Sequence, residues 1–177
     1  MLSEKERKLL KELAIGKITK EQYSKECPLV RDYTEFVELL LSTLTNDENE
    51  YNSLFHSIFW FLPRKIDYDQ EKEMFMHFLL IKGHNEHEEI AQSFQNEWNN
   101  DKENIPVLLK AIEDVPYYIE RIDKYPYIRK LIYAIGAQPE PYNIYALEKL
   151  TRSEDKELVA LALHQIDKRK SNEKIQG

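Results

Sequence analysis

YIRKLIYAIGAQPEPYNIYALEKLTRSEDKELVALALHQI, residues 127–166, contains three helical patterns separated by two breaks. The first pattern ends at Gly136, Pro141 opens the second, and Ser153 separates the second from the third. Apolar positions of the first helix recur 31 residues later, where Ile128, Leu131 and Ile135 correspond to Val159, Ala162 and Ile166. A spacing of about 20–50 residues is typical of stacked helical repeats. The stretch therefore predicts helices that bury their apolar faces against one another.

The rest of the chain has the same character, with amphipathic stretches separated by proline, glycine and polar breaks. Only four glycines occur among 177 residues, while leucine, glutamate, lysine and isoleucine are plentiful, and this composition favours helix. Residues that commonly cap helices precede several stretches: Ser3, Thr19, Asp32 or Thr34, and Asp67 or Asp69. We expect about ten helices, including one near 47–62, one at 85–98, one that opens at Asp101 and a short irregular one within 114–126.

Short loops make neighbouring helices antiparallel, so the predicted fold is an all-α solenoid of about ten antiparallel helices. An irregular α-helical bundle is the alternative. A chain of this length fits one domain, residues 1–177, with a core of its own. Within it we expect divergent N-terminal helices over 1–65, repeating helices over 66–168 and a polar tail over 169–177 that frays.

Charge and composition narrow the possible partners. A net charge of −7 disfavours nucleic acid, which needs a basic face, and suits a basic protein, although many proteins are acidic for solubility alone. No stretch approaches about 18 apolar residues and the N-terminus lacks a signal-peptide pattern, so we expect neither a membrane span nor secretion. The single cysteine, Cys27, allows no internal disulfide, which fits a reducing compartment and a cytoplasmic location.

The segment from His84 to Ile166 resembles bacterial HEAT-like repeat proteins. The resemblance lies in HNEHEEIA (84–91), IRKLIYAIGA (128–137) and ALEKLTRSEDKELVALALHQI (146–166). Ala134-Ile135-Gly136 is similar to the Ala-Leu-Gly turn that ends one helix in that family, and Arg129 stands where such units carry an arginine, but the last unit has Val159 or Ala160 there. The resemblance implies a scaffold that grips a macromolecule on its concave surface. Small acidic members resemble immunity proteins, which neutralise a toxin by binding its active face.

Charged residues cluster at the start of the expected 85–98 helix: His84, Glu86, His87, Glu88 and Glu89. Their simplest role is structural, because acids favour a helix N-terminus and a histidine can bond a loop carbonyl. Contact with a partner is a second possibility. A third is metal binding, because His-Glu pairs bind iron in HEAT-type hydroxylases. A metal site needs three or four convergent ligands and no second adjacent pair occurs, so we expect no metal and no other cofactor.

Catalytic motifs are absent from the sequence. It contains no Gly-x-Ser-x-Gly, no phosphate loop and no dinucleotide fingerprint. Cys27 has the basic neighbours Lys25 and Arg31 but no evident partner histidine, so it is not expected to act as a nucleophile. The sequence therefore predicts no catalytic residue.

Tyrosines and acids concentrate in the C-terminal half, where seven of the eleven tyrosines fall within 29 residues: Tyr117, Tyr118, Tyr125, Tyr127, Tyr133, Tyr142 and Tyr145. Tyrosine is enriched in binding surfaces, although it also packs between helices with its hydroxyl in water. Neighbouring acids would attract a Lys/Arg-rich partner. The expected partner surface comprises Tyr117, Tyr118, Glu120, Asp123, Tyr125, Glu140 and Tyr142, together with His84, His87 and Glu88.

These observations predict a protein-binding module rather than an enzyme. The specific expectation is an immunity protein that neutralises a cognate, basic bacterial toxin domain by binding and occluding it. A metal-dependent HEAT-type enzyme using His84, His87 and Glu88 is the alternative from another class, and a general interaction scaffold is the third.

Overall fold

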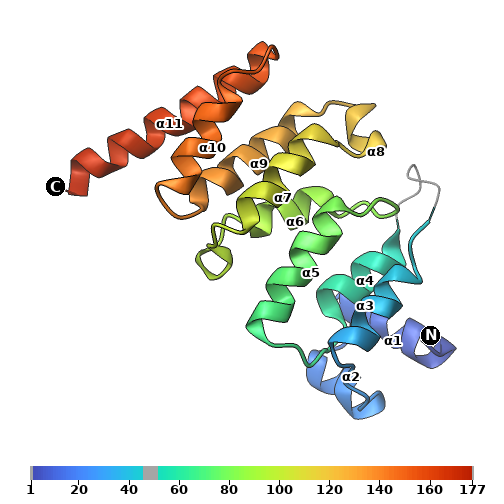
Figure 1. Cartoon of the computed structure of the whole chain (residues 1–177). Helices are drawn as coiled ribbons and strands as arrows, with labels where there is room; N and C mark the ends of the chain where they lie inside the picture. The colour runs from blue at the N-terminus through green and yellow to red at the C-terminus, as the bar shows by residue number, and fades with distance from the viewer. Residues whose placement is uncertain (1, 46–51, 177) are drawn as a thin grey trace. The chain divides into compact units, whose positions relative to one another are not determined.

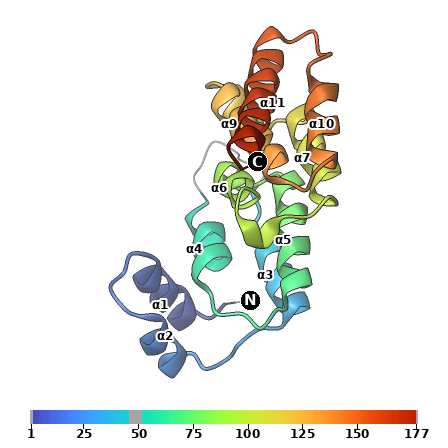
Figure 2. The ribbon, with the colours of Figure 1, turned by 90° about the vertical axis from the view of Figure 1, so that its left-hand side faces the viewer.

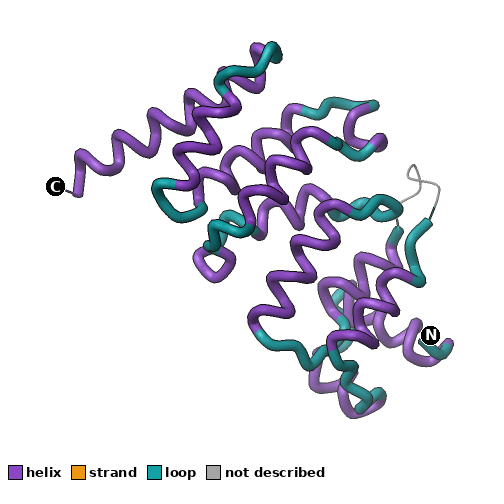
Figure 3. Tube along the Cα trace, in the orientation of Figure 1, coloured by secondary structure: helices purple, strands orange, loops and turns teal. Residues whose placement is uncertain are grey.

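The computed structural model describes residues 2–45 and 52–176, with side chains as far as Arg169. These residues form eleven α-helices and one short 3-10 helix (Figure 1), and Figure 3 shows no strand among them. The all-α prediction is confirmed. The chain divides into two compact units, unit 1 (Met1–Met74 and Ile81–Glu86) and unit 2 (Phe75–Leu80 and His87–Gly177). The expectation that they act as one domain stays a prediction.

Unit 1 contains four complete helices and the first part of a fifth: α1 (Glu4–Ala14), α2 (Lys20–Glu26), α3 (Tyr33–Leu41), α4 (Ser53–Phe61) and α5 (Tyr68–Leu80). Capping boxes start four of them. In each, the cap side chain accepts the amide three residues on, and that residue's side chain accepts the amide of the cap; the caps are Ser3, Thr19, Asp32 and Asp67. Such a cap stabilises a helix by about 1 kcal/mol, which explains why the sequence locates these starts well.

Helix α4 supplies the centre of the unit 1 core, as its nearly all-round apolar pattern suggests. Phe55, Ile58 and Phe59 are fully buried, as are Phe36 and Leu40 of α3, which α4 contacts. The helix begins at Ser53, where Asn52 caps it by accepting the amide of Phe55 at 3.0 Å. The earlier start expected at 47 falls outside the described residues.

An ion pair ties the loop between α2 and α3 to α1. Arg31 donates from Nη2 to Glu6 Oε1 at 2.8 Å, and both side chains are largely buried. Burial raises the pKa of Glu6, but hydrogen bonds from Arg31 and Ser3 outweigh this effect and hold the pKa below its ordinary value. The carbonyl of Arg31 also accepts the amide of Lys65 at 2.8 Å, so two neighbouring segments fix this residue.

Unit 2 is built around α9. Its elements are the end of α5, α6 (His87–Ser93), a 3-10 helix (Glu97–Asn99), α7 (Asn104–Glu113), α8 (Tyr117–Glu120), α9 (Tyr125–Ala137), α10 (Tyr142–Leu150) and α11 (Lys156–Gln176). Helix α9 contacts α6, α7, α10 and α11, and these neighbours bury seven of its residues: Tyr127, Ile128, Leu131, Ile132, Ala134, Ile135 and Gly136. Figure 2 shows α11 flanked by α9 and α10.

The positions that repeat between α9 and α11 are mostly buried. Ile128, Leu131 and Ile135 are buried, as are Ala162 and Ile166, while Val159 is half-buried. Gly136 lies where α9 closely approaches a residue of α11, Gln165. A Cβ at that position would lie 2.2 Å from Nε2 and 2.8 Å from Cγ of Gln165, which is itself buried. The absence of a side chain at Gly136 therefore accommodates Gln165 of α11.

Local hydrogen bonds change two expected helix limits. The helix expected over 85–98 is wrong in extent: α6 spans seven residues, and i+3 hydrogen bonds at Gln95 and Asn96 turn the chain before the 3-10 helix. Helix α7 begins at Asn104 rather than Asp101, because the Asp101 carboxylate accepts the amide of Glu103 in the preceding turn. Residues 169–176 are helical, and their fraying stays a prediction.

Replacing Gly136 with alanine tests the approach of α9 and α11. Alanine gains about 1 kcal/mol of helix propensity over glycine, but overpacking against Gln165 costs about 1–3 kcal/mol. We expect Gly136→Ala to lower the free energy of unfolding measured in urea. The matched control is Gly136→Ala in a Gln165→Ala background, where the obstructing side chain is gone and the alanine should stabilise the protein. A destabilisation that is the same in both backgrounds would contradict this contact.

Candidate functional site

The expected surface residues fall into groups at opposite ends of α9. Tyr117 and Glu120 lie on α8, and Asp123 and Tyr125 lie where α9 begins, whereas Glu140 and Tyr142 follow its other end (Figure 1). Helix α9 has 13 residues and therefore rises about 18 Å. One compact site cannot include both ends, so the group at the start of α9 is a separate surface from Glu140 and Tyr142.

A hollow of about 200 Å³ lies at the start of α9 and combines two of the expected residues with four others. It is lined by Asp123, Tyr125, Pro126, Arg129, Glu157 and Leu161. Glu157 and Leu161 are four residues apart on α11, so they point to the same side of that helix. Packing of α9 against α11 thus brings together residues that are about 30 positions apart in the sequence.

Hydrogen bonds hold the hollow's aromatic wall in place. The hydroxyl of Tyr125 lies 3.2 Å from both carboxylate oxygens of Asp155 and donates to this carboxylate. Asp155 also accepts the amides of Glu157 and Leu158 at 3.1 and 3.2 Å, which caps the start of α11. The ammonium of Lys124 lies 3.5 Å from Asp155 and 5.3 Å from the centre of the Tyr125 ring. The ring of Tyr125 is therefore oriented before any partner arrives.

The same bonds shift two ionisation equilibria. Partial burial raises the pKa of Asp155, but hydrogen bonds from Leu158 and Tyr125 and the charge of Lys124 outweigh it and lower the pKa overall. Burial, together with the hydrogen bond to Asp155, raises the pKa of Tyr125 above its ordinary value. At neutral pH Tyr125 is thus a protonated donor and Asp155 an ionised acceptor.

The chemistry of the hollow suits a cationic side chain with apolar surroundings. Asp123 and Glu157 supply two carboxylates against one guanidinium, that of Arg129. Two large apolar side chains are exposed just before α9: Tyr117 is 59% and Ile122 is 80% exposed. Aromatic and apolar side chains beside acids are typical of surfaces that bind basic proteins.

The two histidines that were expected at the partner surface are buried. His84 and His87 are each about 1% exposed, so they offer no side-chain surface to a partner, and this corrects the expectation. In unit 1 the ring of His84 stacks on Phe55 at 4.2 Å. In unit 2 His87 Nδ1 lies 3.1 Å from the hydroxyl of Tyr118, which is half-buried. Burial raises the pKa of Tyr118.

The acids of this cluster are also engaged in structural contacts. Glu86 is buried in unit 1, with one carboxylate oxygen 2.9 Å from His56 Nδ1 and the other accepting from Trp60 Nε1 at 2.7 Å. Glu88 forms an ion pair with Lys130 at 2.7 Å in unit 2. Across residues 2–45 and 52–176, no three His, Cys, Asp or Glu side chains are placed to share a metal ion. In the same residues, no helix has the length and apolar character to cross a membrane.

Sequence reasoning found two of the six residues that line the hollow. It selected Asp123 and Tyr125 from the density of tyrosines and acids, but it missed Glu157, Leu161 and the network through Asp155. The repeat of 31 residues was the available signal, because it aligns the start of α11 with the start of α9. Stacked repeats place such positions side by side.

Replacing Tyr125 with phenylalanine should raise the pKa of Asp155 towards its ordinary value of 3.8, because one hydrogen-bond donor to the carboxylate is lost. The depressed pKa contributes stability that is present above the unfolded value and is lost as pH falls through the folded value. Wild type and variant should therefore differ in stability at neutral pH and converge in acid. Carboxyl carbon NMR shifts give the pKa, and Tyr145→Phe, on an exposed side chain of α10, is the control. An unchanged Asp155 pKa would exclude this hydrogen bond.

Comparison with protein-family models, with curated proteins and with solved structures finds no match for this chain. The resemblance to HEAT-like repeat proteins consequently depends on the residues quoted for it, and the function has to be inferred from the site.

Proposed function

We propose that this chain is a protein-binding module that receives a basic partner at the start of α9. The observation that carries the proposal is the hollow in which Asp123 and Glu157 flank the fixed ring of Tyr125. A lysine or arginine side chain of the partner fits there, with its charge between the carboxylates and its aliphatic stem against Tyr125 and Leu161.

The surroundings favour a protein over a small molecule. The hollow holds about 200 Å³, which is small for a site that must enclose a whole ligand. Exposed Tyr117 and Ile122 extend the contact area beyond it, and exposed Glu120 adds charge. A central pocket for one anchoring side chain, with apolar and charged residues around it, is the usual anatomy of a protein interface.

The fold around the hollow supports the finer proposal of a HEAT-like solenoid. Helices α9, α10 and α11 pack pairwise, and most of the positions that repeat in sequence between α9 and α11 are buried. In such a solenoid, successive antiparallel helices build a continuous wall whose surface residues come from neighbouring repeats. Asp123 and Tyr125 at the start of α9 and Glu157 near the start of α11 have this relationship.

We propose further that the chain is an immunity protein that covers the active face of a cognate bacterial toxin. Two features support it: the net charge of −7, which matches a basic toxin domain, and the resemblance of the C-terminal half to small acidic HEAT-like proteins. Inhibition would then come from occlusion and would need no catalytic residue. A general scaffold would share the binding surface and differ in the consequence of binding.

Co-expression with the protein encoded beside this chain's gene tests both the binding function and the proposed inhibition of the partner. We expect a complex that weakens as salt rises, because the charges at the hollow lie at the surface and are screened. The triple variant Glu120→Gln, Asp123→Asn, Glu157→Gln should weaken the dissociation constant about tenfold or more, a loss of roughly 1.4 kcal/mol.

The matched control removes the same number of charges elsewhere, with Glu4→Gln, Glu21→Gln and Glu148→Gln, all exposed positions. It should leave the affinity within about twofold, because none of these positions lines the hollow. Equal effects of the two triple variants would refute the site. Binding that leaves the partner's activity intact would refute occlusion while retaining the binding function.

A further inference from the structure

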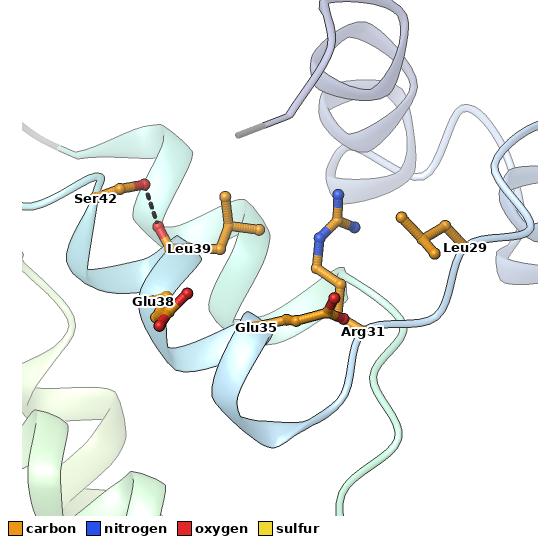
Figure 4. Close-up of a pocket in the computed structure, with 6 residues that line it drawn as sticks. All are labelled: Leu29, Arg31, Glu35, Glu38, Leu39 and Ser42. Carbon is orange, nitrogen blue, oxygen red and sulfur yellow. Dashed lines mark hydrogen bonds between the residues drawn. The ribbon is translucent and has the colours of Figure 1, made fainter.

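Unit 1 contains a second hollow, of about 400 Å³, which the binding surface of unit 2 does not use. It is lined by Leu29, Arg31, Glu35, Glu38, Leu39 and Ser42 (Figure 4). Four of these residues occupy one side of α3, because helical spacing places positions 35, 38, 39 and 42 together. Leu29 and Arg31 come from the loop that precedes α3 and close the hollow at one end.

The guanidinium of Arg31 is buried beside the hollow and is only partly hydrogen-bonded. The residue is 7% exposed, and its Nη2 is paired with Glu6. Its Nη1 is buried and has no hydrogen-bond partner in the structure. Figure 4 shows the guanidinium between the side chains of Leu29 and Leu39. A buried charged donor without an acceptor is rare, because it has lost water without gaining a substitute, and such an atom is a natural point of attachment for a ligand.

Charge around the hollow restricts what that ligand can be. Glu6 already offsets the charge of Arg31, and Glu35 and Glu38 are both exposed on α3. A simple anion would satisfy Nη1 but would be repelled by these carboxylates. A simple cation would suit the carboxylates and leave Nη1 unpaired. The ligand that satisfies both carries an acceptor for Arg31 and a positive charge for α3.

Of the polar groups on α3 that line the hollow, the carboxylate of Glu38 is the most available to a ligand. One carboxylate oxygen of Glu35 accepts the amide of Asp32 at 3.3 Å in the capping box of α3. The hydroxyl of Ser42 donates to the carbonyl of Leu39 at 2.7 Å. Among the described residues the carboxylate of Glu38 has no ion pair, so it can bind a ligand cation without breaking an existing contact.

We propose that this hollow binds a carboxylate joined to a cationic side chain, the chemistry of a free basic amino acid or of the basic C-terminal residue of a peptide. The ligand carboxylate accepts from Nη1 of Arg31, which becomes accessible when the neighbouring side chain of Leu29, 60% exposed, moves aside. The cation lies against Glu38 and Glu35, and the aliphatic stem packs on Leu29 and Leu39. The volume lies in the range typical of small-ligand sites.

Titration of the full chain with chosen probes, followed by NMR shift changes at residues 29–42, tests this assignment. At this hollow L-arginine should bind, whereas L-argininamide, which has the larger positive charge but no carboxylate, should bind about tenfold more weakly or not at all. If acidic charge alone attracted the probe, the order would be reversed. The tripeptide Gly-Gly-Arg distinguishes the two sources: binding equal to that of arginine assigns a peptide C-terminus, and its absence assigns the free amino acid.

Two variants test the two proposed ligand contacts, one with Arg31 and one with Glu38. Arg31→Lys keeps a charge for Glu6 but loses the second nitrogen of the fork, and it should abolish the preference for arginine over argininamide. Glu38→Gln, on an exposed side chain, should leave the fold unchanged and weaken arginine binding about tenfold. Glu21→Gln on α2 is the control that alters the charge of unit 1 away from the hollow.

The proposal is overturned if arginine and argininamide bind equally, or if Glu38→Gln and Glu21→Gln have the same effect. It is also overturned if no probe binds at concentrations up to about 10 mM, beyond which binding has no specific meaning for a site of this size. Circular dichroism and thermal unfolding show whether Arg31→Lys remains folded. If it does not, the Glu38→Gln result decides.

Discussion

Burial of α9 is the constraint on which the rest of unit 2 depends. Seven of its thirteen residues are buried, and they face four different helices. No single neighbour could cover so much apolar surface, so α6, α7, α10 and α11 must all be in place before the helix is removed from water. Gly136 and Gln138 show how closely these neighbours fit: Gly136 makes room for Gln165, and the Gln138 amide donates at 2.8 Å to the carbonyls of Phe94 and Ala134.

That constraint also determines where the protein can bind a partner. The middle and end of α9 are committed to the core, and its first turn is the part that meets the start of α11 at the hollow. Asp155 serves two purposes there, because it caps α11 and orients Tyr125. The residues that could contact a partner are thus held by the same bonds that begin the last helix, and binding needs little reordering of side chains.

Much of the fold follows from local sequence, because helix caps and breaks are local interactions. Ser3, Thr19, Asp32 and Asp67 all cap the helices that they precede, and Pro141 opens α10. The early end of α6 does not follow, because Ile90, Phe94 and Trp98 keep a helical spacing in the sequence although the chain turns after Ser93. Buried side chains reach their places in the core through the turn instead of through a longer helix.

The sites were harder to predict because they combine residues through tertiary contacts. Composition identified the tyrosines and acids near 117–125, but it could not separate them from Glu140 and Tyr142, which lie beyond the far end of α9. The burial of His84 and His87 depends on Phe55 and Tyr118, about 30 positions away in each case. Likewise, nothing in the sequence distinguishes Arg31 from other arginines, because its unpaired Nη1 is a property of the packing around it.

The central claim is that the start of α9 and the start of α11 together receive a cationic side chain. An NMR titration with Nα-acetyl-L-argininamide tests it most directly, because this probe presents a guanidinium and carries no carboxylate. The account predicts amide shift changes concentrated at residues 123–129 and 155–161 that disappear in the Asp123→Asn, Glu157→Gln variant. Shift changes that spare those two segments, or that persist unchanged in the double variant, would contradict it.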